Sequence, residues 1–135
     1  MAKKLKKLTP TLGAISNPQN EEIVFSFKNL KSYSYNTATN DGAFFIRYLE
    51  RLSKISSQTW AAAYTTDRHG IAGIESMKVA SLTEAARNLV PSGIESLIVM
   101  RTSGDNHVFL GHRIGNIFNV IFIEHEFGEV YNHGK

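Results

Sequence analysis

The C-terminal part of the chain holds four of its five histidines, among alternating aliphatic and aromatic residues. Arginine, glutamate and tyrosine occur in the same stretch. Metal-free cleavage of RNA needs these residue types: a base for the 2′-hydroxyl, an acid for the leaving 5′-oxygen, and cations for the charge on phosphorus. Arginine also holds a phosphate bidentately. The candidate catalytic residues are Arg101, His107, Arg113, Glu124, Tyr131 and His133.

The pattern of this region predicts an antiparallel sheet, with strands at 95–101, 107–114, 117–125 and 130–133. Gly115 and Asn116 both tolerate positive φ, so they predict a two-residue hairpin turn that fixes the register of its strands. Counting outward from this turn predicts the cross-strand pairs Arg113–Phe118, Phe109–Phe122 and His107–Glu124. A pair of His125 with Val130 would in turn place Glu124 opposite Tyr131 and Phe122 opposite His133.

These pairings divide the sheet into two unlike faces. One is aliphatic and is expected to pack on the helices; it also carries His112 and His125, which are predicted to be structural. The other holds the six candidate catalytic residues together with three rings that are suited to stacking on bases: Phe109, Phe118 and Phe122. Because unpaired buried charges are costly, this second face is predicted to be partly open. The same contacts of Glu124 with His107 and Tyr131 are also ordinary cross-strand pairs, worth under about 1 kcal/mol each.

Other chemistries find less support in the sequence. There is no cysteine and no HxxxH or HxH spacing, so neither a metal nor a thiol site is predicted. The chain has no G-x-S-x-G elbow for a serine nucleophile and no glycine-rich phosphate loop, so no cofactor is expected.

The elements before the sheet are predicted to be a strand within 21–30, a helix over 41–56, a short helix around Trp60, a strand within 74–80 and a helix over 81–90. Asn40 or Asp41 is the expected cap of the first helix, and Ser81 with Glu84 forms a capping box for the last. Arg47, Arg51 and Lys54 share one face of the first helix, and Arg47 and Arg51 are candidate RNA-binding residues. Solvation is the commoner fate of such a face.

The 135 residues suit one domain: a basic flexible arm over 1–20 and a single α+β domain over 21–135, with the N-terminal strand and helices packed on the C-terminal antiparallel sheet. The formal net charge of +3 permits an acidic partner such as RNA. The absence of cysteine favours a cytoplasmic location, and no apolar run is long enough to predict a membrane span.

The order strand, helix, helix and antiparallel sheet over 21–135 resembles the RelE/ParE superfamily of toxin–antitoxin ribonucleases. The segment "VMRTSGDNHVFLGHRIGNIFNVIFIEHEFGEVYNH" is similar to the arginine- and glycine-containing hairpins of small bacterial toxins, and Tyr131-x-His133 to their C-terminal pairs. This resemblance implies site roles for Arg101, Arg113, Tyr131 and His133. The chain departs from the family in its additional helix over 81–90 and in its longer arm.

The leading hypothesis is therefore a metal-independent endoribonuclease toxin that acts on mRNA, blocked by an acidic antitoxin segment lying over Arg101 and Arg113. The alternative is a non-catalytic module that binds RNA or a protein through the same sheet face. A third hypothesis is a structural or phage-defence component that does not contact RNA.

Overall fold

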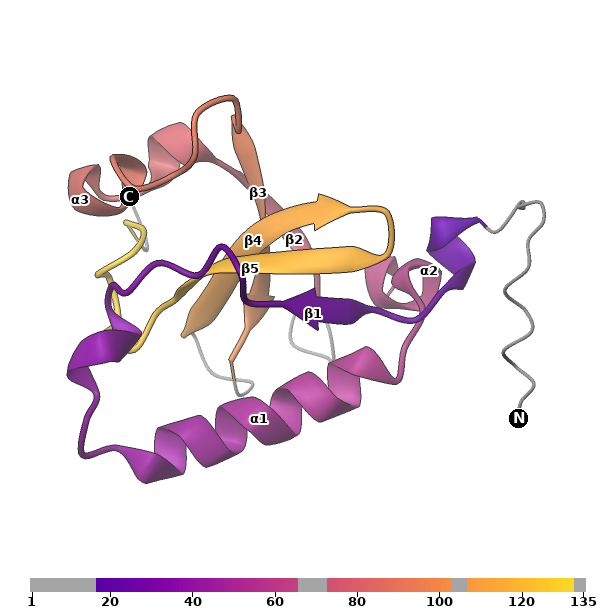
Figure 1. Cartoon of the computed structure of the whole chain (residues 1–135), viewed down its shortest axis with the longest axis horizontal. Coiled ribbons are helices and arrows are strands. Elements are labelled where there is room, and N and C mark those ends of the chain that lie inside the picture. The colour runs from indigo at the N-terminus through magenta and orange to yellow at the C-terminus, as the bar shows by residue number, and fades with distance from the viewer. Residues whose placement is uncertain (1–16, 66–72, 103–106, 133–135) are drawn as a thin grey trace.

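The computed structural model describes residues 17–65, 73–102 and 107–132. Within them the protein is α+β, with a five-stranded sheet in the order β1-β5-β4-β3-β2 (Figure 1). The strands are β1 (Val24–Ser26), β2 (Glu75–Lys78), β3 (Ser96–Arg101), β4 (Val108–Ile114) and β5 (Ile117–Ile123). The helices are α1 (Gly42–Ser56), α2 (Trp60–Tyr64) and α3 (Glu84–Arg87).

One face of the sheet packs against α1, which runs along it in Figure 1. The helix begins where Asp41 Oδ1 accepts a hydrogen bond from the backbone N–H of Phe44 at 3.1 Å, as the predicted cap requires. Its buried side chains recur every three or four residues and contact Phe109 and Phe118 of the sheet. They are Phe44, Tyr48, Leu52 and Ile55.

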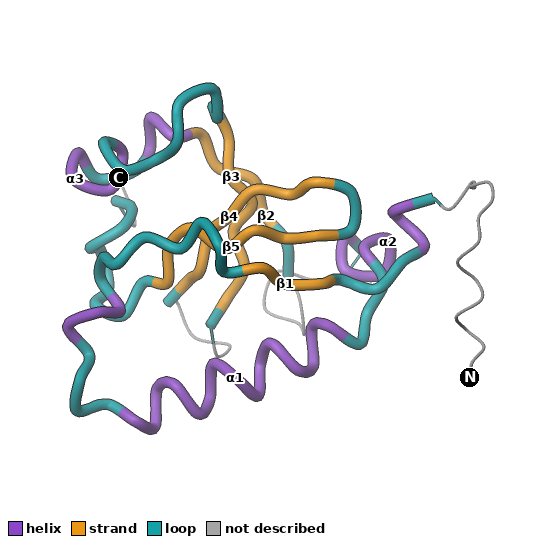
Figure 2. Tube along the Cα trace, in the orientation of Figure 1, coloured by secondary structure: helices purple, strands orange, loops and turns teal. Residues whose placement is uncertain are grey.

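The second face is covered over part of its area by α3 and the C-terminal loop, residues 124–132. Leu82, Ala86 and Val130 form a second apolar cluster with Leu110 and Phe122 of the sheet. Figure 2 shows that the segments joining β1 to α1 and following β5 are largely irregular.

The β4–β5 hairpin confirms the Gly115-Asn116 turn and the register next to it, including Ile114 opposite Ile117 and Arg113 opposite Phe118. The register shifts at Leu110/Gly111, where Leu110 pairs with Phe122 and leaves Ile121 as the extra residue of a β-bulge. The predicted pair of Phe109 with Phe122 is wrong, because Phe109 lies opposite Ile123.

The predicted strand at 130–133 is also wrong over its described residues, 130–132. Tyr131 forms one isolated bridge with Leu82 and does not pair with β5. The edge of β5 that a further strand would have needed is occupied by β1, which pairs with it in parallel through Val24 and Ile117.

The remaining predicted elements differ mainly in their bounds. The helix predicted over 81–90 is reduced to the four residues of α3, and its cap is Thr83 instead of Ser81. Of the predicted arm, residues 17–20 include the 3-10 turn Pro18–Asn20, and the rest lies outside the described residues. No helix in the described part of the chain has the length and apolar character to cross a bilayer.

Candidate functional site

Three cations on neighbouring turns of α1 form what we call the α1 cationic flank: Arg47, Arg51 and Lys54. With Glu50 they line a shallow depression of about 180 Å³. Their spacing of four and three residues places them along about 10 Å of the helix axis. Arg47 and Lys54 form no ion pair with any residue that the structure describes. Two of the three cations of the flank are therefore outside any described ion pair.

The flank is connected to the end of β3. Arg51 Nε donates a hydrogen bond to the backbone carbonyl of Arg101 at 3.2 Å. The next residue, Thr102, donates its backbone N–H to the carbonyl of His107 at 3.0 Å. Two predicted site residues, Arg51 and His107, are thus joined through two consecutive residues of the chain. The Arg101 side chain is itself buried and lies 3.7 Å from Glu75.

The predicted open aromatic face is wrong. Phe109 and Phe118 lie in the core under α1, and Phe122 lies in the cluster on the opposite face. All three rings are fully buried, so they cannot stack on bases. The β-bulge at Ile121 exchanges the two faces for the side chains of β5 that follow it, so Phe122 points away from Phe118. The uninterrupted apolar sequence of this strand gives no indication of the bulge.

Glu124 is 0% exposed, although the sequence predicts it on an open face. Its Oε2 accepts hydrogen bonds from the backbone N–H groups of Gly128 and Val130, both at 3.1 Å. The carboxylate thus closes the C-terminal loop on itself. The predicted pair of Glu124 with His107 is wrong, because the bulge at Ile121 brings Glu124 next to Val108, whose carbonyl accepts its backbone N–H at 2.9 Å. The predicted pair with Tyr131 is wrong, because the loop turns back before a fourth strand can form.

The other predicted site residues lie apart. Arg113 stacks on Trp60, with Cζ 4.1 Å from the ring centroid, and its Nε donates to the carbonyl of Gly115 at 2.7 Å. Tyr131 packs in the cluster on the opposite face, as its bridge to Leu82 requires. His133 lies outside the described residues. The predicted catalytic set is divided between the two faces of the sheet: Arg101, Glu124 and Tyr131 lie on the side of the second cluster, whereas Arg113 lies on the side of α1.

Arg101 and Arg113 also cannot lie under one partner segment on one face of the sheet. Arg101 pairs with Val108, a residue of the cluster beneath α3, so its side chain projects to that side. Arg113 stacks on Trp60, which belongs to the core beneath α1. The expected position of an acidic antitoxin segment is therefore wrong.

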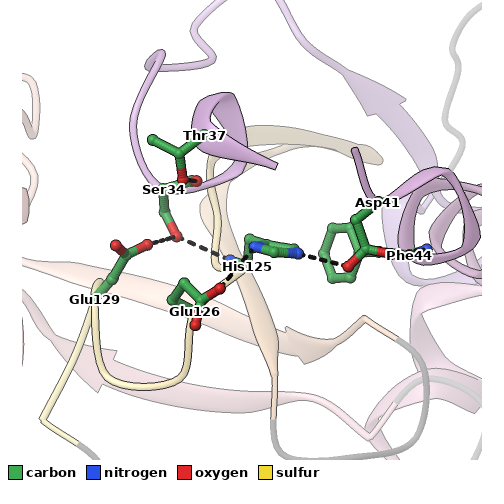
Figure 3. A network of polar contacts seen from close by, with 7 residues as sticks. All are labelled: Ser34, Thr37, Asp41, Phe44, His125, Glu126 and Glu129. Carbon is green, nitrogen blue, oxygen red and sulfur yellow. Dashed lines mark hydrogen bonds and ion pairs between the residues drawn. The ribbon is translucent and has the colours of Figure 1, made fainter. Parts of the chain in front are cut away.

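A polar network that the sequence did not predict joins the C-terminal loop to the start of α1 (Figure 3). His125 Nε2 lies 2.8 Å from Asp41 Oδ2, and the edge of its ring meets the Phe44 ring. The hydrogen bond from His125 and that from the Phe44 N–H lower the pKa of Asp41. His125 was expected to be structural, and its contacts agree with such a role.

Ser34 extends this network. The backbone N–H of His125 donates to Ser34 Oγ at 2.8 Å, and the Ser34 hydroxyl donates to Glu129 Oε1 at 2.6 Å (Figure 3). Ser34 has a φ of 74°, and the backbone N–H of Tyr35 donates to the carbonyl of Tyr33 across it. This γ-turn geometry is strained for a serine, and the two hydrogen bonds of the side chain offset the strain.

The network does not form a nucleophile–base pair. Ser34 Oγ contacts the backbone of His125, not its imidazole. His125 Nδ1 lies 3.4 Å from Glu126 Oε2 without hydrogen-bond geometry, and it is buried from solvent. A substrate therefore has no described route to this nitrogen. No three histidine or acidic side chains within 17–65, 73–102 and 107–132 are placed to hold a metal ion.

Comparison of the chain with family models, with curated proteins and with solved structures gives no match. The geometry of the described residues is therefore the ground on which a function is proposed.

Proposed function

We propose that the protein binds RNA through the α1 cationic flank. The observation that carries the proposal is the depression lined by Arg47, Arg51, Lys54 and a single acid, Glu50. Arg47 and Lys54, which form no ion pair with any described residue, attract phosphates, and they do so whatever the base sequence. Arg51, held by the Arg101 carbonyl, is oriented before a ligand arrives, which reduces the entropy lost on binding.

The binding should depend steeply on salt. For a single strand, the logarithm of the association constant falls with the logarithm of salt concentration by about 0.7 for each phosphate neutralised. Three contacts give a slope of about −2. Because the three stacking rings predicted from the sequence are buried, little preference among base sequences is expected.

The test is a salt titration of binding to a fluorescent 20-nucleotide uridine homopolymer. The variant Arg47→Ala/Arg51→Ala/Lys54→Ala should lose most of the affinity, and its slope should approach zero. Glu50→Gln removes the one acid of the depression and should strengthen binding.

Lys28→Ala removes one positive charge from an exposed position outside the flank, as a single flank variant such as Arg47→Ala does within it, and it should leave both slope and affinity nearly unchanged. Equal losses for Lys28→Ala and for a single flank variant would mean that only net charge matters. The proposal of a defined RNA surface would then be wrong.

As a second proposal, the protein is an endoribonuclease toxin that cleaves the bound RNA without a metal ion. Two observations favour it. Among the described elements, the strand β1 is followed by two helices, α1 and α2, and the later strands form the rest of the sheet. The resemblance to the RelE/ParE superfamily was based on this order. In addition, His107, a half-buried imidazole, lies just before β4, and its carbonyl accepts a hydrogen bond from Thr102, the residue after the Arg101 that contacts Arg51.

Cleavage is tested by incubating mRNA with the protein in the presence of EDTA. The wild type should cut, and His107→Ala should cut at least about 100-fold more slowly, which is the usual loss for an acid or base. Binding of the uridine homopolymer by His107→Ala should remain. Binding without any cleavage by the wild type would support the non-catalytic alternative and end the toxin proposal.

A further inference from the structure

The outward side of α1 carries two large aliphatic side chains that the fold leaves in solvent. Ile46 is 59% exposed and Leu49 is 64% exposed. They lie three residues apart, so they are neighbours on the helix surface. We call this pair the α1 ridge. A single exposed aliphatic residue is common, but two adjacent ones beside a hollow form a continuous apolar surface.

The hollow lies beside the ridge at the start of α1. It has a volume of about 290 Å³ and is lined by Tyr35, Asn36, Ala38, Thr39, Gly42 and Phe45. Gly42 and Phe45 each lie four residues before a member of the ridge, so hollow and ridge follow one another on the helix surface. The aromatic side chains of Tyr35 and Phe45 make the hollow suitable for an apolar side chain of a partner.

The α1 cationic flank lies on the other side of the ridge, beyond Glu50. With about 100° between successive helical residues, Ile46 and Leu49 project between Phe45 on one side and Glu50 on the other, and Lys54 and Arg47 follow beyond Glu50. Phosphates gain nothing from an aliphatic ridge, so RNA explains the flank but not the ridge or the hollow. A surface with an apolar centre and a net positive charge beside it matches a protein segment with apolar residues and adjacent acids.

We propose that the outward side of α1 binds an acidic amphipathic helix of another protein. Its apolar side chains cover the ridge and enter the hollow, and its acidic side chains meet Arg47 and Lys54. This inference does not depend on RNA binding, but it implies that such a partner and RNA compete for the same cations. The partner would therefore act as an inhibitor of RNA binding.

The test selects displayed random 16-residue peptides on the full-length protein, in buffer without RNA. Enriched peptides should carry a net negative charge and apolar residues at helical spacing. Their affinity should fall at least tenfold for Ile46→Ser/Leu49→Ser and for Arg47→Glu/Lys54→Glu. Val24→Ser/Ile114→Ser changes two other exposed aliphatic residues, on β1 and β4, and should leave the affinity unchanged.

Two further measurements complete the test. Thermal midpoints of all variants should match the wild type, since every substituted residue is exposed. The selected peptides should also displace the uridine homopolymer. The proposal is overturned if no peptide is enriched, if the enriched peptides are basic, or if Ile46→Ser/Leu49→Ser binds them as the wild type does. It is also overturned if that double variant loses RNA as strongly as Arg47→Ala/Lys54→Ala, because the ridge would then belong to the RNA surface.

Discussion

The charged residues of the C-terminal loop and those of the α1 cationic flank differ in how their charges are satisfied. His125 of the loop meets Asp41 at the start of α1, and the preceding residue, Glu124, accepts two backbone hydrogen bonds within the loop. On the α1 cationic flank, Arg47 and Lys54 have no ion-pair partner in the described residues. Residues of the first group should contribute to stability, whereas those of the flank should contribute to binding.

The largest effect is expected at Glu124. Glu124→Ala leaves the buried N–H of Val130 and the half-buried N–H of Gly128 without their acceptor, which should lower the free energy of unfolding by about 3 kcal/mol. Urea denaturation at pH 7 measures this loss. Glu95→Ala, at an exposed position, is the control and should change little. A small effect of Glu124→Ala would contradict its assignment to the loop.

The next effect should appear at Asp41 and should depend on pH. Because its folded pKa lies below the ordinary value of 3.8, the carboxylate stabilises the fold above pH 3.8, and this contribution is lost as the pH falls through the lowered pKa. Asp41→Asn should therefore be less stable than the wild type at pH 7, and the difference should disappear in acid. Thermal midpoints between pH 2 and 7 measure it, with Glu95→Gln as the control. A difference that stays constant down to pH 2 would contradict the role of the charge.

Tyr48 is a core residue with an unsatisfied polar group. Its substitution should change the free energy of unfolding less than that of Glu124, and in the opposite direction. Burial raises its pKa, and its hydroxyl has no hydrogen-bond partner in the described structure. Tyr48→Phe removes this unsatisfied group and should increase the free energy of unfolding by about 1 kcal/mol. The thermal midpoint should then rise by about 4 °C. A lower midpoint would mean that the hydroxyl does form a hydrogen bond.

The smallest effect on stability is expected on the flank itself. Arg47→Ala/Lys54→Ala should change the free energy of unfolding by less than about 0.5 kcal/mol, as is usual for exposed residues. The salt slope of RNA binding should nevertheless decrease in magnitude by about 1.4, which is 0.7 for each of two lost contacts. A marked loss of stability with an unchanged slope would reverse the distinction between the two groups.

The features that the sequence predicted correctly depend on nearby residues. The shared face of Arg47, Arg51 and Lys54 follows from helical spacing alone, and the first pairs of the β4–β5 hairpin follow from the turn at Gly115. The turn gives the register only as long as no residue is inserted. Ile121 fits an apolar strand in either register, so the bulge has no signal in the sequence.

The features that were missed depend on residues far apart in the chain. Asp41 and His125 are separated by 84 positions, and neither has a sequence neighbour that indicates the other. The burial of Glu124 follows from the return of the C-terminal loop, and the place of β1 beside β5 excluded the predicted fourth strand. A residue pattern assigns side chains to faces, but it does not indicate which distant segment covers each face.

The parallel pairing of β1 with β5 has a consequence for biosynthesis. β1 leaves the ribosome well before its partner strand, residues 117–123. Until then the apolar side of α1 lacks the sheet residues Phe109 and Phe118 that cover it. The nascent chain therefore exposes this surface until β5 has been made, because β1 and β5 are far apart in the sequence. Folding of this domain should be completed only after β5 has left the ribosome.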